Sequence, residues 1–193
     1  MNAPSGQTLL IAPIQDLDIP LLEQIGRDIH RVYGFQTDID GLLSDIRFSY
    51  DAERDQYYST PILEKLQGLA PPHALKVLAV TREDLFIPIL THVYGEAQLG
   101  GRACIVSTFR LCEGVHAPLR KETLYKRVAK EAVHELGHTF NLRHCRDQSC
   151  IMHYCRTIKD VDRKSNELCR YCKILLKDEF ERLGLTGRVP SAR

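Results

Sequence analysis

The stretch from His134 to Cys155, HELGHTFNLRHCRDQSCIMHYC, constrains this chain more than any other part of it. It holds four histidines and three cysteines in twenty-two residues, which is more metal-binding chemistry than a structural segment needs. His134 and His138 are four residues apart in a predicted helix, so both imidazoles lie on one face, one turn apart. The chain must therefore fold so that this helix face borders a metal site.

His144 is the candidate for a third ligand, and it cannot reach the same ion from an unbroken helix. At ~1.5 Å per residue, it would lie roughly 9 Å beyond His138 along the helix axis. The helix must therefore end after His138, and the chain must turn back. Asn141 stands where this break is needed, and asparagine adopts a left-handed backbone more readily than other non-glycine residues.

Glu135 directly follows the first of these ligands. It is too close to His134 in sequence to act as a third ligand on the same helix face, but it is well placed to take a proton from a water molecule at the metal. Zinc with three protein ligands keeps an open position for such a water. The remaining histidines are interpreted as surface residues or hydrogen-bonded core residues: His30, His73, His92, His116 and His153.

The cysteines are concentrated after this segment, where five of the seven occur. Cys145 and Cys150 enclose four residues and Cys169 and Cys172 enclose two, and paired cysteines at such spacings suit a closed, structural four-thiolate zinc site. The second pair is expected at the start of the final helix, whose free N–H groups stabilise thiolates. Cys155 competes for a place in this site, and the alternative for all five is a redox-active or merely buried cluster.

The sequence HELGHTFNLRH followed by CIMHY resembles the metzincin metallopeptidases. Their extended motif is HExxHxxGxxH with a later methionine turn, and Asn141 replaces the glycine of that motif here. The spacing from His144 through Cys145, Cys150 and Met152 to the later CRYC is similar to the archaemetzincin pattern. This resemblance covers residues 134–172, about a fifth of the chain.

The resemblance implies two zinc ions per chain. A catalytic zinc ion would be bound by three histidines: His134, His138 and His144. A structural zinc ion would be bound by four cysteines: Cys145, Cys150, Cys169 and Cys172. Glu135 would be the general base, Met152 would form the apolar floor beneath the histidines, and Cys155 would remain a buried thiol. Tyr154 is a candidate for binding zinc or stabilising the oxyanion.

Hydrophobic periodicity predicts strands that alternate with helices. The predicted strands are residues 8–13, 35–39, 74–81 and two runs within 86–110, which are joined at Leu99–Gly101 by a hairpin or a glycine-rich connection. The predicted helices are residues 19–33, 59–69, 119–136 and 165–183. Residues 45–58 are expected to form a loop or a weak strand.

This order predicts an α/β (α+β) fold with a mixed twisted sheet, an active-site helix and a small irregular C-terminal lobe that ends in a helix. The resemblance implies that the fold is metzincin-like. We expect one metallopeptidase domain over residues 1–193. Its N-terminal α/β subdomain would comprise residues 1–142, and its C-terminal subdomain with the structural zinc would comprise residues 143–193.

The composition excludes several partner classes. The net charge of +1 does not indicate a nucleic-acid or membrane partner through bulk electrostatics, and 44% hydrophobic residues is an ordinary globular value. The apolar run LLIAP is too short for a signal peptide, and no stretch has the length of a membrane span. We therefore expect a cytoplasmic monomer that acts on a peptide or protein substrate, with no nucleic-acid or membrane partner.

The predicted function is zinc-dependent hydrolysis of peptide bonds. The alternative is a two-zinc peptide-binding or scaffold protein with little or no peptidase activity, although binding alone would not require a base such as Glu135. A third reading is metal-assisted hydrolysis of another bond. A strand within Ile105–Leu111 is expected to present its edge so that the substrate lies alongside as an extra strand.

Overall fold

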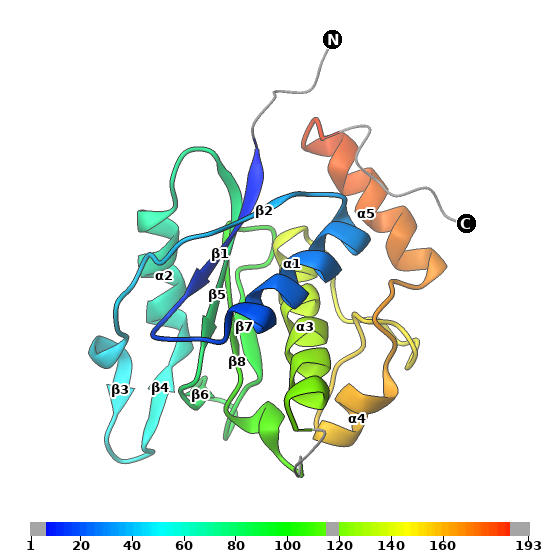
Figure 1. The fold of residues 1–193 in the computed structure, drawn as a ribbon. Helices are drawn as coiled ribbons and strands as arrows, with labels where there is room; N and C mark the ends of the chain where they lie inside the picture. Colours follow the sequence, from blue (N-terminus) through cyan, green and yellow to red (C-terminus); the bar gives the residue numbers. More distant parts are fainter. Residues whose placement is uncertain (1–6, 115–119, 186–193) are drawn as a thin grey trace.

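The protein is built around a five-stranded sheet in the order β2-β1-β5-β8-β7 (Figure 1). The structure is a computed structural model that describes residues 7–114 and 120–185. The strands of the sheet are β1 (Thr8–Pro13), β2 (Thr37–Ile39), β5 (Ala74–Thr81), β7 (Gly95–Ala97) and β8 (Ala103–Ser107). Neighbouring strands are parallel except β7 and β8, which form the predicted antiparallel hairpin.

Helices cover both faces of this sheet, and they confirm the predicted α/β class. The helices are α1 (Ile19–Tyr33), α2 (Ser59–Leu69), α3 (Arg120–Thr139), α4 (Ile158–Arg163) and α5 (Arg170–Arg182). Figure 1 shows α1 and α3 together on one face and α2 on the other, with α4 and α5 beside α3. A small second sheet contains β3 (Tyr50–Asp51), β4 (Gln56–Tyr58) and β6 (Leu85–Phe86), and single 3-10 turns form at Arg47–Ser49 and Arg110–Cys112.

The buried strands divide their side chains between two cores. Leu9 and Ile11 of β1 pack with α1, α3 and α5, whereas Leu10 and Ala12 pack with α2. This alternation follows from the period of two in a strand, and it requires apolar residues at every position because both faces are covered. The core beneath α3 also contains Met152 from the C-terminal part of the chain, so the sheet and the later segments bury one another's apolar surface.

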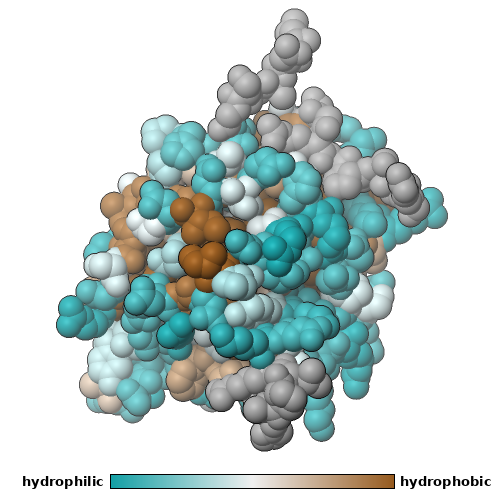
Figure 2. All heavy atoms as spheres, viewed as in Figure 1, coloured by the Kyte–Doolittle hydropathy of each residue, from teal (hydrophilic) through white to brown (hydrophobic). Residues whose placement is uncertain are grey.

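The outer surface on the α1 side is largely hydrophilic, with apolar side chains gathered beside α1 over β1 and β2 (Figure 2). On strand β2 at the sheet edge, Ile39 is 43% exposed. No helix in residues 7–114 and 120–185 has the length and apolar content needed to cross a bilayer.

The end of the chain corrects one sequence prediction. The expected helix over 165–183 is wrong at its start, because α5 begins only at Arg170, and α4 is a separate helix. Cys169 has an extended backbone at φ −66° and ψ 166°, and its sulfur accepts the N–H of Cys172 as a helix cap.

Two other predictions fall partly or wholly outside the described residues. The active-site helix is present from Arg120, and its expected first residue, Leu119, lies outside the described residues. His116 lies outside them as well.

The second predicted strand is shorter than expected, since β2 covers only Thr37–Ile39. The expected subdomain division after residue 142 stays a prediction.

Candidate active site

The helix α3 supplies the first part of the site and ends where the sequence requires a break. The helix stops at Thr139, and Asn141 adopts the left-handed backbone with a φ of 62°. The carbonyl of His138 accepts hydrogen bonds from the backbone N–H groups of Asn141 and Gly100, both at 2.9 Å. The turn at Asn141 therefore returns the chain toward α3, and the β7–β8 hairpin caps the helix end.

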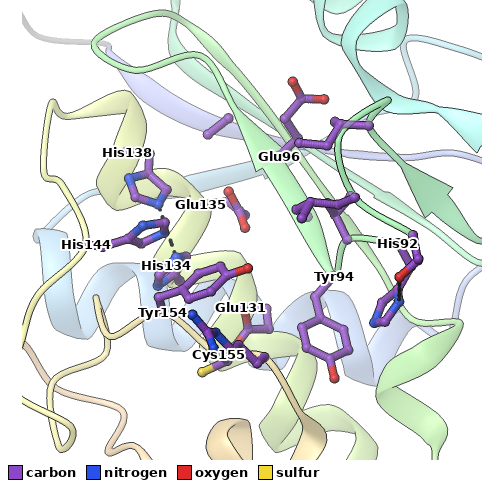
Figure 3. Close-up of a pocket in the computed structure, with 17 residues that line it drawn as sticks. His92, Tyr94, Glu96, Glu131, His134, Glu135, His138, His144, Tyr154 and Cys155 are labelled. Carbon is purple, nitrogen blue, oxygen red and sulfur yellow. Dashed lines mark hydrogen bonds between the residues drawn. The ribbon is translucent and has the colours of Figure 1, made fainter.

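The three histidines of the motif point toward one another (Figure 3). His134 Nδ1 lies 2.9 Å from the carbonyl oxygen of Ile151, and His138 Nδ1 lies 2.7 Å from that of Leu142. Each of these nitrogens thus carries the proton and donates it, which leaves Nε2 as the metal-binding atom. The two Nε2 atoms are 3.1 Å apart, and His144 completes a group whose ligand atoms lie within 4.8 Å of one another.

Burial keeps these imidazoles in the neutral form that binds metals. Desolvation lowers the pKa of His134 well below its ordinary value and lowers the pKa of His138 to about 4. Partial desolvation also lowers the pKa of His144, whose side chain is the most exposed of the three. Three neutral imidazoles that converge on one point, two of them fixed by backbone carbonyls, fit a zinc ion that keeps an open position.

Glu135 lies beside this group on the same helix, and both line a cavity of about 320 Å³. Burial raises the pKa of Glu135 well above its ordinary value, and the nearby Glu131 carboxylate acts in the same direction. Gly95 of β7 lies against the Glu135 side chain so closely that a Cβ atom there would be 2.7 Å from Glu135 Cγ. The strand β7 therefore forms the opposite wall of the cavity.

Met152 and Tyr154 both lie close to the histidine group. Met152 is fully buried, and its sulfur packs so closely against α3 that a Cβ atom at Gly137 would overlap it. Tyr154 is 41% exposed, lines the cavity, and its ring centroid lies 5.0 Å from that of His144. The methionine thus lies beneath the histidines, and the tyrosine lies at the mouth of the site.

Four cysteines form a second cluster, with ligand atoms within 4.8 Å of one another: Cys145, Cys150, Cys169 and Cys172. Their sulfurs receive backbone donors, since the N–H of Cys169 lies 3.3 Å from Cys150 Sγ and that of Cys172 lies 3.5 Å from Cys169 Sγ. Burial alone would raise the pKa of Cys169, but the N–H of Cys172 and the neighbouring thiols hold it below its ordinary value. Such a donor set suits a closed tetrahedral zinc site.

Cys155 lies outside this cluster and lines the cavity of the histidine site instead. Its thiol is half-buried rather than fully buried, and burial raises its pKa to about 11. His153 and His30 are hydrogen-bonded to backbone carbonyls, as predicted for them. His92 lies at the cavity wall near Tyr94, a position that the sequence did not indicate.

The prediction that a strand within Ile105–Leu111 presents its edge to the substrate is wrong. β8 lies between β5 and β7, so its backbone groups are already paired on both sides. Strand β7 precedes the turn after Gln98 and strand β8 follows it, and β7 is the outermost strand of the sheet. The free edge beside the histidines therefore belongs to β7.

Three further residues of the site could not be found from the motif. Glu131 lies one turn before Glu135 on α3 and lines the cavity. Its carboxylate is paired at 2.7 Å with the ammonium group of Lys164, which arrives from the segment after α4. Tyr94 lines the cavity from the residue before β7. Glu131 repeats the helical spacing of the motif, whereas the other two reach the site only through the tertiary fold.

Comparison with known proteins places this arrangement in a family. A sequence profile of Peptidase family M54 matches residues 25–178. The archaemetzincin of Methanopyrus kandleri is 40% identical over 136 residues, which cover 70% of this chain and 74% of that protein. The archaemetzincin of Pyrococcus furiosus is 34% identical over 183 residues, which cover 91% of this chain and 94% of that protein.

Solved structures agree with the sequence relatives. The crystal structure of the Methanopyrus kandleri archaemetzincin matches with a TM-score of 0.81 and 31% identity over 94% of this chain and 100% of that chain. A zinc-dependent peptidase from Methanocorpusculum labreanum matches with a TM-score of 0.78 and 26% identity over 87% and 99% of the two chains. The chain therefore belongs to peptidase family M54, the archaemetzincin family of zinc metallopeptidases.

Proposed function

We propose that the chain hydrolyses peptide bonds at its three-histidine site, with Glu135 as the general base. The observation that carries this proposal is the convergence of three neutral imidazoles beside one buried carboxylate in a cavity that borders a free strand edge. A metal site that served only to hold the chain together would have no need of a base or of an open cavity.

The chemistry divides between the metal and the protein. A zinc ion on His134, His138 and His144 would supply a Lewis acid for the scissile carbonyl and a positive charge that favours the ionised form of Glu135. Glu135 accepts the proton of the attacking water and passes it to the leaving amine. The carbonyls of Ile151 and Leu142 hold two of the imidazoles in one tautomer and one orientation.

The substrate would bind as an additional strand along the edge of β7. Gly95, Glu96 and Ala97 all line the cavity, and β8 occupies only the other side of β7. Backbone hydrogen bonds to such an edge fix an extended peptide without regard to its side chains. The hydroxyl of Tyr154, at the mouth of the site, would stabilise the oxyanion of the reaction.

The four-cysteine cluster would hold a second, structural zinc ion. Its four thiols leave no position for water, so it would not take part in the chemistry. Cys145 directly follows His144, and the N–H of Cys145 donates to the carbonyl of Met152 at 2.9 Å. The cluster would therefore fix both the third catalytic ligand and the methionine beneath it.

Cleavage of a peptide library by the wild type and by Glu135→Ala, with zinc measured in both, tests the proposal. We expect two zinc ions per chain in both proteins, and a fall in kcat of at least about a hundredfold in the variant, because loss of a general base removes on the order of 10²–10⁴ in rate. Equal cleavage by the two proteins would contradict the role of Glu135.

The alternative is a two-zinc peptide-binding or scaffold protein with little or no peptidase activity. Two zinc ions with no cleavage of any library member would favour it. Cleavage of an ester or another amide, with every peptide left intact, would favour metal-assisted hydrolysis of a different bond. Burying the carboxylate of Glu135 costs free energy, and a site that only bound peptides would gain nothing from that cost. The buried carboxylate therefore favours hydrolysis over binding alone.

A further inference from the structure

One side of the catalytic cavity carries polar groups that the proposed chemistry does not use. Glu131 lies one turn of α3 away from Glu135, is 3% exposed, and lines the cavity. Tyr94 and Cys155 line the same cavity, and in Figure 3 the Tyr94 ring, from the residue before β7, lies on the same side of it as Glu131 and Cys155. These groups adjoin the reacting centre and are open to a ligand in the cavity.

The Glu131 carboxylate presents a hydrogen-bond acceptor to the cavity. Its buried Oε1 atom forms an ion pair with Lys164 Nζ at 2.7 Å and has no other hydrogen-bond partner in the described part of the chain. The Lys164 side chain is 0% exposed, and it lies behind the carboxylate, 3.5 Å from His134 Nδ1. Glu131 lines the cavity and Lys164 does not, so a ligand in the cavity meets the carboxylate and not the ammonium group.

Tyr94 adds a second unpartnered group. The residue is 8% exposed, and within residues 7–114 and 120–185 its hydroxyl has no hydrogen-bond partner. Burial raises the pKa of Tyr94 to about 12, and the nearby Glu131 carboxylate adds to this shift, so the hydroxyl keeps its proton. It can therefore both donate and accept a hydrogen bond.

We propose that Glu131 and Tyr94 form the polar end of a substrate side-chain subsite, which selects peptides with an uncharged hydrogen-bonding side chain next to the scissile bond. The favoured groups are carboxamides and hydroxyls, as in glutamine, asparagine, threonine and serine. A carboxamide can donate to Glu131 and accept from Tyr94 at once. This inference rests on the proposed peptidase function and specifies its substrate class.

The charges around the subsite exclude the other side-chain classes. A lysine or arginine of the substrate would add a cation near Lys164, whose charge already balances that of Glu131. It would also lie near Arg156, which lines the cavity and forms no ion pair with a described residue. An acidic side chain would face Glu131 and Glu135. An apolar side chain would remove water from Glu131 and Tyr94 without replacing its hydrogen bonds.

The test uses peptides that differ only by glutamine or methionine, which have similar shapes, at each of the two positions that flank the scissile bond. We expect the wild type to favour glutamine in kcat/KM by at least about tenfold at one position, because a buried polar group left without a partner is costly. Tyr94→Phe and Glu131→Gln should each reduce this ratio to below about threefold. The same ratio should appear in peptide affinity for the inactive Glu135→Ala variant.

Matched controls separate the subsite from general damage. Glu122→Gln alters a glutamate on the same helix that is also paired with a lysine, Lys126, but lies at the surface. Tyr50→Phe removes a hydroxyl on the remote strand β3, where it is bonded to Asp55. Both controls should keep the wild-type ratio, and Tyr94→Phe decides the question if Glu131→Gln does not fold.

Three results would overturn the subsite. Cleavage that favours methionine, lysine or glutamate at both flanking positions would refute it and leave the peptidase function intact, as would a glutamine preference that Tyr94→Phe retains. An absence of cleavage of every peptide by a wild type that holds two zinc ions would instead refute the proposed function, and the subsite with it.

Discussion

Asn141 adopts a backbone conformation that most residues avoid, and this conformation returns His144 to the metal site. Its φ of 62° lies in the left-handed region, where asparagine is tolerated and glycine is unstrained. We expect Asn141→Ala to lower the free energy of unfolding by about 1 kcal/mol, the usual cost of a left-handed non-glycine residue. Denaturant unfolding measures this change.

Asn141→Gly provides the comparison for that substitution. Glycine stands at this position in the motif that the sequence resembles, and it adopts a positive φ without a steric penalty. The folded state of the glycine variant should therefore be no more strained than that of the wild type. Its unfolded chain has the greater entropy, which acts against this gain. An alanine variant as stable as the glycine variant would show that the backbone strain argument is wrong.

Gly95 determines how closely β7 approaches the general base. A Cβ atom at this position would lie 2.5 Å from the carbonyl oxygen of Ile105 and 2.8 Å from Glu135 Oε1. We expect Gly95→Ala to displace Glu135 and to lower kcat about tenfold to a hundredfold, since small misplacements of catalytic groups have effects of that size. Steady-state kinetics together with zinc content test this expectation.

Gly68→Ala is the matched control, because nothing lies within 4 Å of the Cβ atom that it would add. Gly68 is on α2, where alanine favours the helix, so this variant should keep full activity and gain about 0.5–1 kcal/mol of stability. Full activity in Gly95→Ala would contradict the close approach of β7 to Glu135.

At the scale of residues, the sequence predicted the groups that lie at fixed spacings along the chain. His134, Glu135 and His138 follow the period of one helix, and Asn141 has the chemistry of the turn that returns His144. Tyr94 and Lys164 carry no such signal, since they reach the site from 40 residues before His134 and 30 residues after it. Only the tertiary fold shows that they border the same cavity.

Lys76 joins three elements at the end of the active-site helix. It lies on β5, is 5% exposed, and donates to the carbonyl oxygens of Gly101 at 2.6 Å and Thr139 at 2.7 Å. The first belongs to the β7–β8 hairpin and the second to the last residue of α3. This side chain therefore fixes the β7–β8 hairpin relative to the helix that carries the histidines, and it satisfies a carbonyl at the helix end.

The charge of Lys76 gives stability a pH dependence of known sign. Burial lowers its pKa from 10.5 to about 8 in the folded state, so between these values the unfolded chain binds more protons than the folded chain. The contribution of this group to the free energy of unfolding should therefore rise from pH 8 to pH 10.5. Lys76→Met should lack this rise, which denaturant unfolding across that pH range measures.

Lys65 supplies a comparison for that experiment, since its ammonium group lies over the Phe48 ring near the surface. Lys65→Met should keep the pH profile of the wild type. If the difference in unfolding free energy between the wild type and Lys76→Met is independent of pH, then the charge of Lys76 is not affected by its burial.

At the scale of elements, hydrophobic pattern predicted what local sequence determines and failed where long-range contacts decide. The helix Ile19–Tyr33 has buried residues at helical spacing and a glycine at its end with a φ of 74°, and it forms as predicted. The final helix starts late because Cys169 is drawn into the cysteine cluster, which no periodicity indicates. The free edge was predicted on the wrong strand, because the hydrophobic pattern of one strand does not show which strands it pairs with.

The two clusters are joined at one peptide bond, between His144 and Cys145. Cys145 forms an isolated β-bridge with His153, and the backbone N–H of His153 donates to the carbonyl oxygen of Cys150 at 2.9 Å. Residues of the cysteine cluster therefore hold the turn that contains Met152. We expect Cys169→Ser to speed the loss of zinc from the histidine site to a chelator. Unchanged zinc loss in a folded variant would contradict this coupling.

Cys112→Ser is the control, because Cys112 lies outside both clusters and donates to the carbonyl of Phe109. It should keep both zinc ions and their rates of loss.

The helix α3 is also tied to the C-terminal part by Arg127, which donates to both carboxylate oxygens of Asp162 at 2.7 and 2.8 Å. A loosened histidine site in Cys169→Ser would therefore reflect the local turn and not separation of the whole C-terminal part.

For the molecule as a whole, we expect one chain to hold two zinc ions with separate ligand sets. Zinc K-edge absorption on the purified protein, together with zinc content, tests it most directly. We predict two zinc ions per chain and a mean shell that contains sulfur at ~2.3 Å and nitrogen or oxygen at ~2.0–2.1 Å in similar amounts, from four cysteines on one ion and three histidines on the other. A single zinc ion, or a shell without sulfur, would contradict the account.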